Sequence, residues 1–350
     1  MTNRRYRSKA RKAVHPGAKR RAAHPCRGIC RRVNFCAPYL PTSSFTDLMR
    51  RLTLLIVTIL SLSCAPAPPT RLDPAVAPLG GPRPRGSLVI VGGGPRGEAI
   101  TQKFIALAGG SGRARVLVLP MASSLPETGP ESVDEFRKHG VAAWAMNLTR
   151  GEAMREETAR ALDSATGIWF PGGDQARIMA VLDGTPTAAA IRARYAAGAV
   201  VGGTSAGAAV MSTPMLTGDE RAPGGARRDT TQSFITVARE DVVVTNGLGL
   251  LEGAIVDQHF LRRKRHNRLI SVVLEHPALL AIGIDESTAL VVEPGKPWSV
   301  IGESAAIIYD ARHAAVTPAA APILGAADMR MYVLPAGSSF DPHTAAAHLP

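Results

Sequence analysis

The chain has 350 residues, of which 45% are hydrophobic, so it can bury the core of one large domain or two smaller ones. It contains 41 Lys and Arg against 28 Asp and Glu, a net charge of +13 that would suit a partner such as nucleic acid. Residues 1–48, however, hold 12 of the basic residues and one acid, Asp47, whereas the chain after Cys64 holds 27 of each sign. Because the chain after Cys64 is neutral, its charge excludes nucleic acid as the partner.

The basic extension, residues 1–48, precedes a second methionine, and we expect it to be disordered or not translated. Residues 49–64, MRRLTLLIVTILSLSC, have two arginines, an apolar run and small residues before a cysteine, as signal peptides do. The run falls short of the roughly 18 residues that a membrane-spanning helix needs. We expect an exported protein anchored in the cell envelope by a lipid on Cys64, with a secreted or periplasmic protein as the alternative.

Residues 65–86 are rich in Pro, Ala and Gly and predict a linker. One catalytic domain is expected over residues 87–345. Its predicted strands are 88–91, 116–119, 167–170 and 199–202, and its predicted helices are 98–107, 132–139, 175–182, 187–197 and one from Ser205. Short apolar strands that alternate with helices indicate an α/β fold of three layers, αβα, with a mainly parallel sheet. The working residues of such sheets follow the carboxyl ends of the strands.

The first predicted strand leads into residues 92–97, GGGPRG, which contain the G-x-G-x-x-G pattern of dinucleotide-binding proteins. The acidic residue that would bind the ribose is missing after the second strand, where Pro120 and Met121 stand. A tight glycine turn is therefore the favoured interpretation. No cluster of residues has the spacing of metal ligands, so we expect neither a metal nor a cofactor.

Residues 203–207, GTSAG, match the G-x-S-x-G pattern of a nucleophile elbow between a strand and a helix. Ser205 would sit on the sharp turn, and the N–H of Ala206 would face a developing oxyanion. A second glycine turn, GGDQ at residues 172–175, could supply another oxyanion donor from Gly173, with Asp174 as the N-cap of the next helix.

Residues 257–268, DQHFLRRKRHNR, follow an apolar stretch, and His259 is the best candidate base there. Helical spacing would place Arg262, Arg265 and Arg268 on one face and Arg263 on another. Further along, Asp285 or Glu286 could orient the histidine as the acid of a triad.

These segments together resemble the cyanophycinase branch of peptidase family S51, which is related to peptidase E. The resemblance rests on GGDQ, GGTSAGA, DQHFLRRKRHNRL and GIDESTAL in this order. It implies a fold like that of class I glutamine amidotransferases, a serine-type exopeptidase and a possible homodimer. It implies Ser205 as nucleophile, His259 as base and Glu286 as acid. The substrate-binding residues that it implies are Gln175, Asp257, Gln258, Arg263, Arg265 and Arg268.

The implied substrate is cyanophycin, a polyaspartate with arginine on each side chain, and the implied products are β-Asp-Arg dipeptides. Arginines suit its carboxylates, and Asp257 would suit its guanidinium groups. Two features depart from the family: Pro-Arg-Gly follows the first glycine turn, and residues 213–240 are polar, as expected of a loop over the site. A peptidase for other aspartyl peptides and a non-catalytic surface binding protein are the alternatives.

Overall fold

A computed structural model describes residues 84–221, 227–229 and 236–350. All of them belong to one compact unit, Arg71–Pro350. The basic extension, the signal peptide with Cys64, and the linker up to residue 83 lie outside the described residues. None of the described helices is long and apolar enough to cross a membrane.

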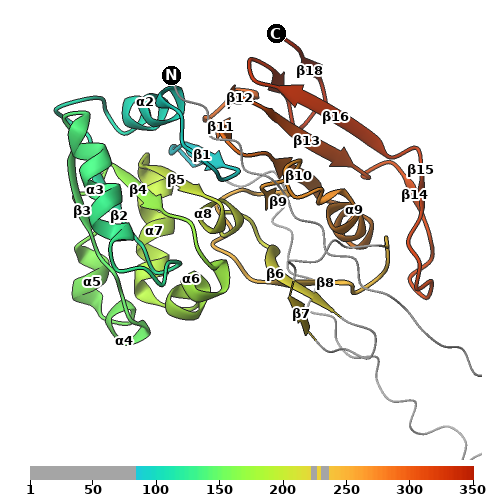
Figure 1. The fold of residues 1–350 in the computed structure, drawn as a ribbon, viewed down its shortest axis with the longest axis horizontal. Coiled ribbons are helices and arrows are strands. Elements are labelled where there is room, and N and C mark those ends of the chain that lie inside the picture. The colour runs from blue at the N-terminus through green and yellow to red at the C-terminus, as the bar shows by residue number, and fades with distance from the viewer. Residues whose placement is uncertain (1–83, 222–226, 230–235) are drawn as a thin grey trace, which may run out of the picture. The chain divides into compact units, whose positions relative to one another are not determined.

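The central sheet combines a parallel half with an antiparallel half (Figure 1). The parallel strands are β1 (Leu88–Val91), β2 (Arg115–Val118), β3 (Ala142–Ala145), β4 (Gly167–Phe170) and β5 (Val200–Thr204). The antiparallel strands are β11 (Thr288–Val292), β12 (Trp298–Gly302), β17 (Ser339–Phe340) and β18 (Ala347–His348). The strand order is β18-β17-β12-β11-β1-β5-β4-β2-β3. Strand β1 therefore lies between β5, which is parallel to it, and β11, which is antiparallel.

Helices cover both faces of this sheet, as the predicted three layers require. They are α2 (Glu98–Leu107), α3 (Thr128–Lys138), α4 (Arg150–Ala153), α5 (Glu156–Arg160), α6 (Gln175–Leu182), α7 (Pro186–Ala197) and α8 (Ala206–Ala209). Because side chains alternate along a strand, Val89 of β1 packs in one cluster with Phe104 of α2. Its neighbour Ile90 packs in another cluster with Ile191 of α7.

Further sheets extend the central one. A second sheet has the order β16-β13-β10-β9, with β9 (Ala254–Gln258), β10 (Leu280–Ile284), β13 (Ala305–Asp310) and β16 (Arg330–Pro335). Helix α9 (His266–Glu275) packs on it through Leu269 and Val273. Strands β6 (Met215–Arg221), β7 (Arg227–Asp229) and β8 (Val242–Thr245) form a third sheet, and β14 (Ala315–Val316) pairs with β15 (Ala326–Ala327). The polar stretch 213–240, expected to be a loop, thus contributes strands.

The predicted elements agree with the structure where periodicity is clear. Helices 98–107 and 175–182 have the predicted bounds, whereas helix 132–139 begins earlier, at Thr128. The helix expected from Ser205 is the single short turn α8, whose residues are all buried. Strand β3 and the helices α4 and α5 were not predicted, because their short sequences carry little periodicity.

Candidate active site

Ser205 occupies a strained turn between β5 and α8. Its φ is 54°, and its backbone N–H donates to the carbonyl oxygen of Val91 at 3.0 Å. The flanking glycines are needed for close packing, because a Cβ on Gly203 would overlap the backbone of Gly207, and one on Gly207 would overlap the backbone of Phe170. The turn has the geometry of a nucleophile elbow.

His259 reaches this serine from the end of β9. Its Nε2 lies 2.8 Å from Ser205 Oγ, and its backbone N–H donates to the carbonyl oxygen of Gly92 at 2.6 Å. The residue has φ 50° and is 9% exposed. A histidine in this position can accept the proton of the serine hydroxyl.

Glu286 completes the arrangement. Its Oε1 lies 2.7 Å from His259 Nδ1. An ionised carboxylate only accepts, so Nδ1–H donates to Glu286 and Nε2 is left to accept from Ser205. Asp285, the other candidate acid, instead accepts from the Arg262 amide at 2.9 Å and from Ser304 Oγ at 2.8 Å. The geometry therefore favours Glu286 as the acid.

The glycine turn after β1 lies against both the histidine and the glutamate. A Cβ on Gly93 would overlap the imidazole of His259, and one on Gly94 would lie 2.9 Å from Glu286 Cβ. This role was missed at the level of sequence, where the turn was interpreted only as a tight connection. The sequence offers only three consecutive glycines directly after the first strand, and nothing in this motif indicates which distant residues pack against it.

We expect Gly93→Ala to lower kcat/KM by at least about 100-fold, because displacement of the imidazole by about 1 Å disrupts the serine contact. Gly110→Ala is the matched control, since Gly110 also has a positive φ (82°) but nothing within 4 Å of an added Cβ. Both variants place alanine at a positive φ, but only Gly93→Ala also brings a Cβ against His259. Steady-state kinetics of the two variants therefore separate the effect of this contact from that of backbone strain. Equal activities would show that the turn does not determine the position of His259.

The second glycine turn also lies beside the serine. A Cβ on Gly172 would lie 3.5 Å from Ser205 Cβ, and Gly173 has φ 141° with the backbone of Ala122 against it. Asp174 caps α6 by accepting from the Ala176 amide at 2.8 Å, as predicted. The oxyanion roles of Gly173 and Ala206 stay predictions, supported by this proximity and by the place of Ala206 at the start of α8.

Burial lowers the pKa of His259 below its usual value of 6.5, and the nearby charge of Arg263 acts in the same direction. The hydrogen bond to Glu286 opposes this shift. A base works only when neutral, so we expect the acidic limb of the kcat/KM profile to lie below pH 6.5. Glu286→Gln should move this limb to still lower pH, because the variant removes the carboxylate that raises the pKa of His259. A pH–rate profile in which the limb moved upward would contradict this assignment.

The substrate-binding candidates occupy two environments. Asp257 is 0% exposed and binds Arg268 (Nε–Oδ2 2.7 Å) and Arg265 (Nη1–Oδ1 3.3 Å). Arg265 also donates to Gln258 Oε1 at 2.9 Å, and the Nε2 of the buried Gln175 donates to the Leu216 carbonyl at 2.9 Å. Asp257 therefore faces arginines of its own chain, which corrects the expectation that it faces a substrate guanidinium.

The expected helical face of arginines is also corrected. Helix α9 begins only at His266, and Lys264 before it has φ 54°, so Arg262 precedes the helix and Arg265 is its N-cap. Arg265 and Arg268 are buried, whereas Arg263 is exposed. Of the three arginines expected to bind substrate, Arg263, Arg265 and Arg268, only Arg263 is open to solvent, and it lies beside His259.

A serine on an elbow, hydrogen-bonded to a histidine that a carboxylate holds, on a three-layer αβα sheet, is the arrangement of a serine hydrolase. The sequence model of peptidase family S51 matches residues 88–297, and the chain belongs to this family of serine-type peptidases. The resemblance seen in the sequence motifs is thereby confirmed.

Known relatives agree with this membership. The cyanophycinase of Synechococcus elongatus is 37% identical over 240 residues, which are 67% of this chain and 70% of that protein. The cyanophycinase of Trichormus variabilis is 34% identical over 267 residues, 73% of this chain and 85% of that protein. The crystal structure of a peptidase from an acI-B1 actinobacterium has a TM-score of 0.52 at 23% identity and covers 74% of this chain and 98% of that one. That likeness shows the shared αβα fold.

Proposed function

We propose that this serine peptidase hydrolyses cyanophycin to β-Asp-Arg dipeptides. The observation that carries the proposal is the hydrogen-bonded series Ser205, His259 and Glu286 in a chain whose relatives include cyanophycinases. Each unit of cyanophycin displays a carboxylate and a guanidinium. The exposed Arg263 beside His259 would bind such a carboxylate.

In the proposed reaction Ser205 Oγ attacks the backbone carbonyl of an aspartyl unit while His259 Nε2 takes the hydroxyl proton. Glu286 stabilises the imidazolium, and the N–H groups of Gly173 and Ala206 stabilise the oxyanion. Return of the proton to the leaving amine breaks the peptide bond and leaves an ester on Ser205. Water activated by His259 then hydrolyses this ester and restores the free serine.

We assign the buried set Asp257, Gln258, Arg265 and Arg268 a supporting role in the same site. Its hydrogen bonds join the end of β9 to the start of α9, on either side of His259 and Arg263. These residues would therefore hold the base and the exposed arginine in place, rather than contact the substrate themselves.

The proposal is tested by incubating the purified chain with insoluble cyanophycin and, separately, with an α-aspartyl dipeptide. We expect β-Asp-Arg to be released from cyanophycin, detected by mass spectrometry, and no release by Ser205→Ala. Cleavage of the α-aspartyl dipeptide alone would indicate a peptidase for other aspartyl peptides. Failure to cleave either substrate would indicate a non-catalytic binding protein.

We further propose that the protein acts outside the cytoplasm, anchored by a lipid on Cys64. The support is the sequence of residues 49–64, which resembles a lipoprotein signal. Expression from Met49 with a labelled fatty acid should give a labelled, membrane-bound product, and Cys64→Ala should give an unlabelled one. An intact, soluble N-terminus would reject export. The possible homodimer stays a prediction.

A further inference from the structure

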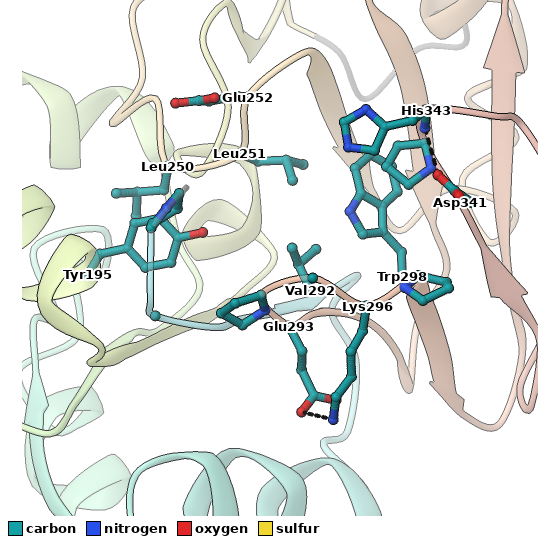
Figure 2. A pocket seen from close by; sticks show the side chains of 16 residues that line it. Tyr195, Leu250, Leu251, Glu252, Val292, Glu293, Lys296, Trp298, Asp341 and His343 are labelled. Carbon is teal, nitrogen blue, oxygen red and sulfur yellow. Dashed lines mark hydrogen bonds and ion pairs between the residues drawn. The ribbon is translucent and has the colours of Figure 1, made fainter. Parts of the chain in front are cut away.

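A cavity of about 370 Å³ lies at the end of the central sheet opposite the catalytic residues. Figure 2 shows the residues that line it. Gly86, just before β1, lines it, as does Val292, which pairs with Leu88 at the start of β1. Ser205 instead follows the last residue of β5, which is parallel to β1. None of the three catalytic candidates lines this cavity. Its volume lies in the range that holds small ligands.

Two largely buried side chains direct hydrogen-bond donors into the cavity. Tyr195, at the end of α7, and Trp298, at the start of β12, are each 6% exposed. Figure 2 shows the Tyr195 hydroxyl and the Trp298 ring nitrogen directed toward the interior. Neither group has a hydrogen-bond partner among the described residues. Both polar atoms open into the cavity, so they can donate to a ligand with an acceptor group.

A carboxylate lies near these donors. Glu252 is exposed on the wall of the cavity and forms no ion pair within the described part of the chain. Burial, and then the charge of Glu252, raise the pKa of Tyr195, so the phenol stays neutral and able to donate. Across the cavity Glu293 is already paired with Lys103 at 2.9 Å and with Lys296 at 3.2 Å. Glu252 is thus available for a cationic group.

We propose that this cavity is a second binding site, for an arginyl unit whose amino group is acylated. The free carboxylate of the unit accepts from Tyr195 and Trp298, and its guanidinium pairs with Glu252. Leu250, Leu251 and Val292 contact the aliphatic part between the two charged ends. The inference rests on the proposed function, because cyanophycin carries such an arginyl unit in every repeat. The site would then hold the particulate polymer while Ser205, His259 and Glu286 cleave it.

Calorimetric titration of the full-length Ser205→Ala variant with Nα-acetyl-L-arginine tests the site. This probe has the carboxylate, the guanidinium and the acylated nitrogen of a polymer unit. Adding Glu252→Gln or Tyr195→Phe should each weaken one binding event by about tenfold, the usual effect of losing a hydrogen bond to a charged group. Glu156→Gln, at an exposed acid on α5, is the control and should change nothing. Unchanged affinity in both cavity variants, or no binding at all, would overturn the proposal.

Two further measurements distinguish a polymer unit from free arginine as the ligand, and distinguish failure of this site from failure of the proposed function. Free arginine, whose ammonium replaces the acylated nitrogen, should bind more weakly than the probe; equal binding would assign the site to the free amino acid. With Ser205 intact, Glu252→Gln and Tyr195→Phe should hydrolyse insoluble cyanophycin several-fold more slowly. Normal hydrolysis by both would leave the proposed function standing and remove the polymer-holding role. If the native chain did not hydrolyse cyanophycin but the variants still lost binding of the probe, the binding site would stand and cyanophycin would be rejected as its ligand.

Discussion

Replacing Ser205 with alanine should lower kcat on cyanophycin by at least about 10⁴-fold, which is the usual loss when a catalytic nucleophile is removed. The expectation follows from the 2.8 Å contact between Ser205 Oγ and His259 Nε2 and from the positive φ that places this hydroxyl at the tip of the elbow. The measurement is the rate of dipeptide release under saturating substrate.

The same variant should fold normally, because alanine fills less space than serine and Ser205 side-chain contacts are confined to the site. Its thermal unfolding should match that of the native chain within a few degrees. Ser164→Ala, at an exposed serine far along the sequence, is the matched control and should keep full activity. Residual activity above about one per cent in pure Ser205→Ala would contradict the assignment of the nucleophile.

The largest effect on stability is expected for Asp257→Ala. Asp257 is 0% exposed, and it holds the guanidinium groups of Arg268 (1% exposed) and Arg265 (8% exposed). Its removal takes the carboxylate away from these two buried guanidinium groups, and breaking a buried ion pair in this way typically costs about 3–5 kcal/mol. Burial and the neighbouring Arg268 already lower the pKa of Arg265 to about 10, so the cluster tolerates little further loss of negative charge.

Urea denaturation of Asp257→Ala should show this loss as a lower free energy of unfolding. Asp163→Ala, which removes an exposed carboxylate, should change it by less than about 0.5 kcal/mol. Asp257→Asn keeps the shape but not the charge and should fall between the two. If Asp257→Ala were as stable as the control, the arginines would have to be neutralised by something other than this aspartate.

The elbow and its partners were predictable because each lies at the end of a strand with a clear pattern. The glycine context of Ser205 and the apolar stretch before His259 are local signals, and their positions in the fold follow from the parallel sheet. The role of Gly93 was not predictable, because it depends on a histidine 166 residues later that packs against it. Contacts between distant segments leave no trace in a short motif.

The arginines show a different limit. Their spacing predicts a shared face only if the helix starts right after His259, yet Lys264 has φ 54° and α9 begins at His266. A positive φ at a lysine is not visible in the sequence, and neither is the burial of Arg268. The sequence therefore indicated a cluster of arginines after His259 but not which of them meet solvent and which meet Asp257.

The three catalytic segments share one point of attachment. Successive carbonyl oxygens of the chain leaving β1 receive them: Val91 accepts from the amide of Ser205, Gly92 from that of His259, and Gly93 from that of Ser287, next to Glu286. One stretch of backbone thus sets the register of nucleophile, base and acid alike. Inserting or deleting a single residue between Val91 and Gly93 would change the spacing of these three acceptors and so misalign nucleophile, base and acid relative to one another.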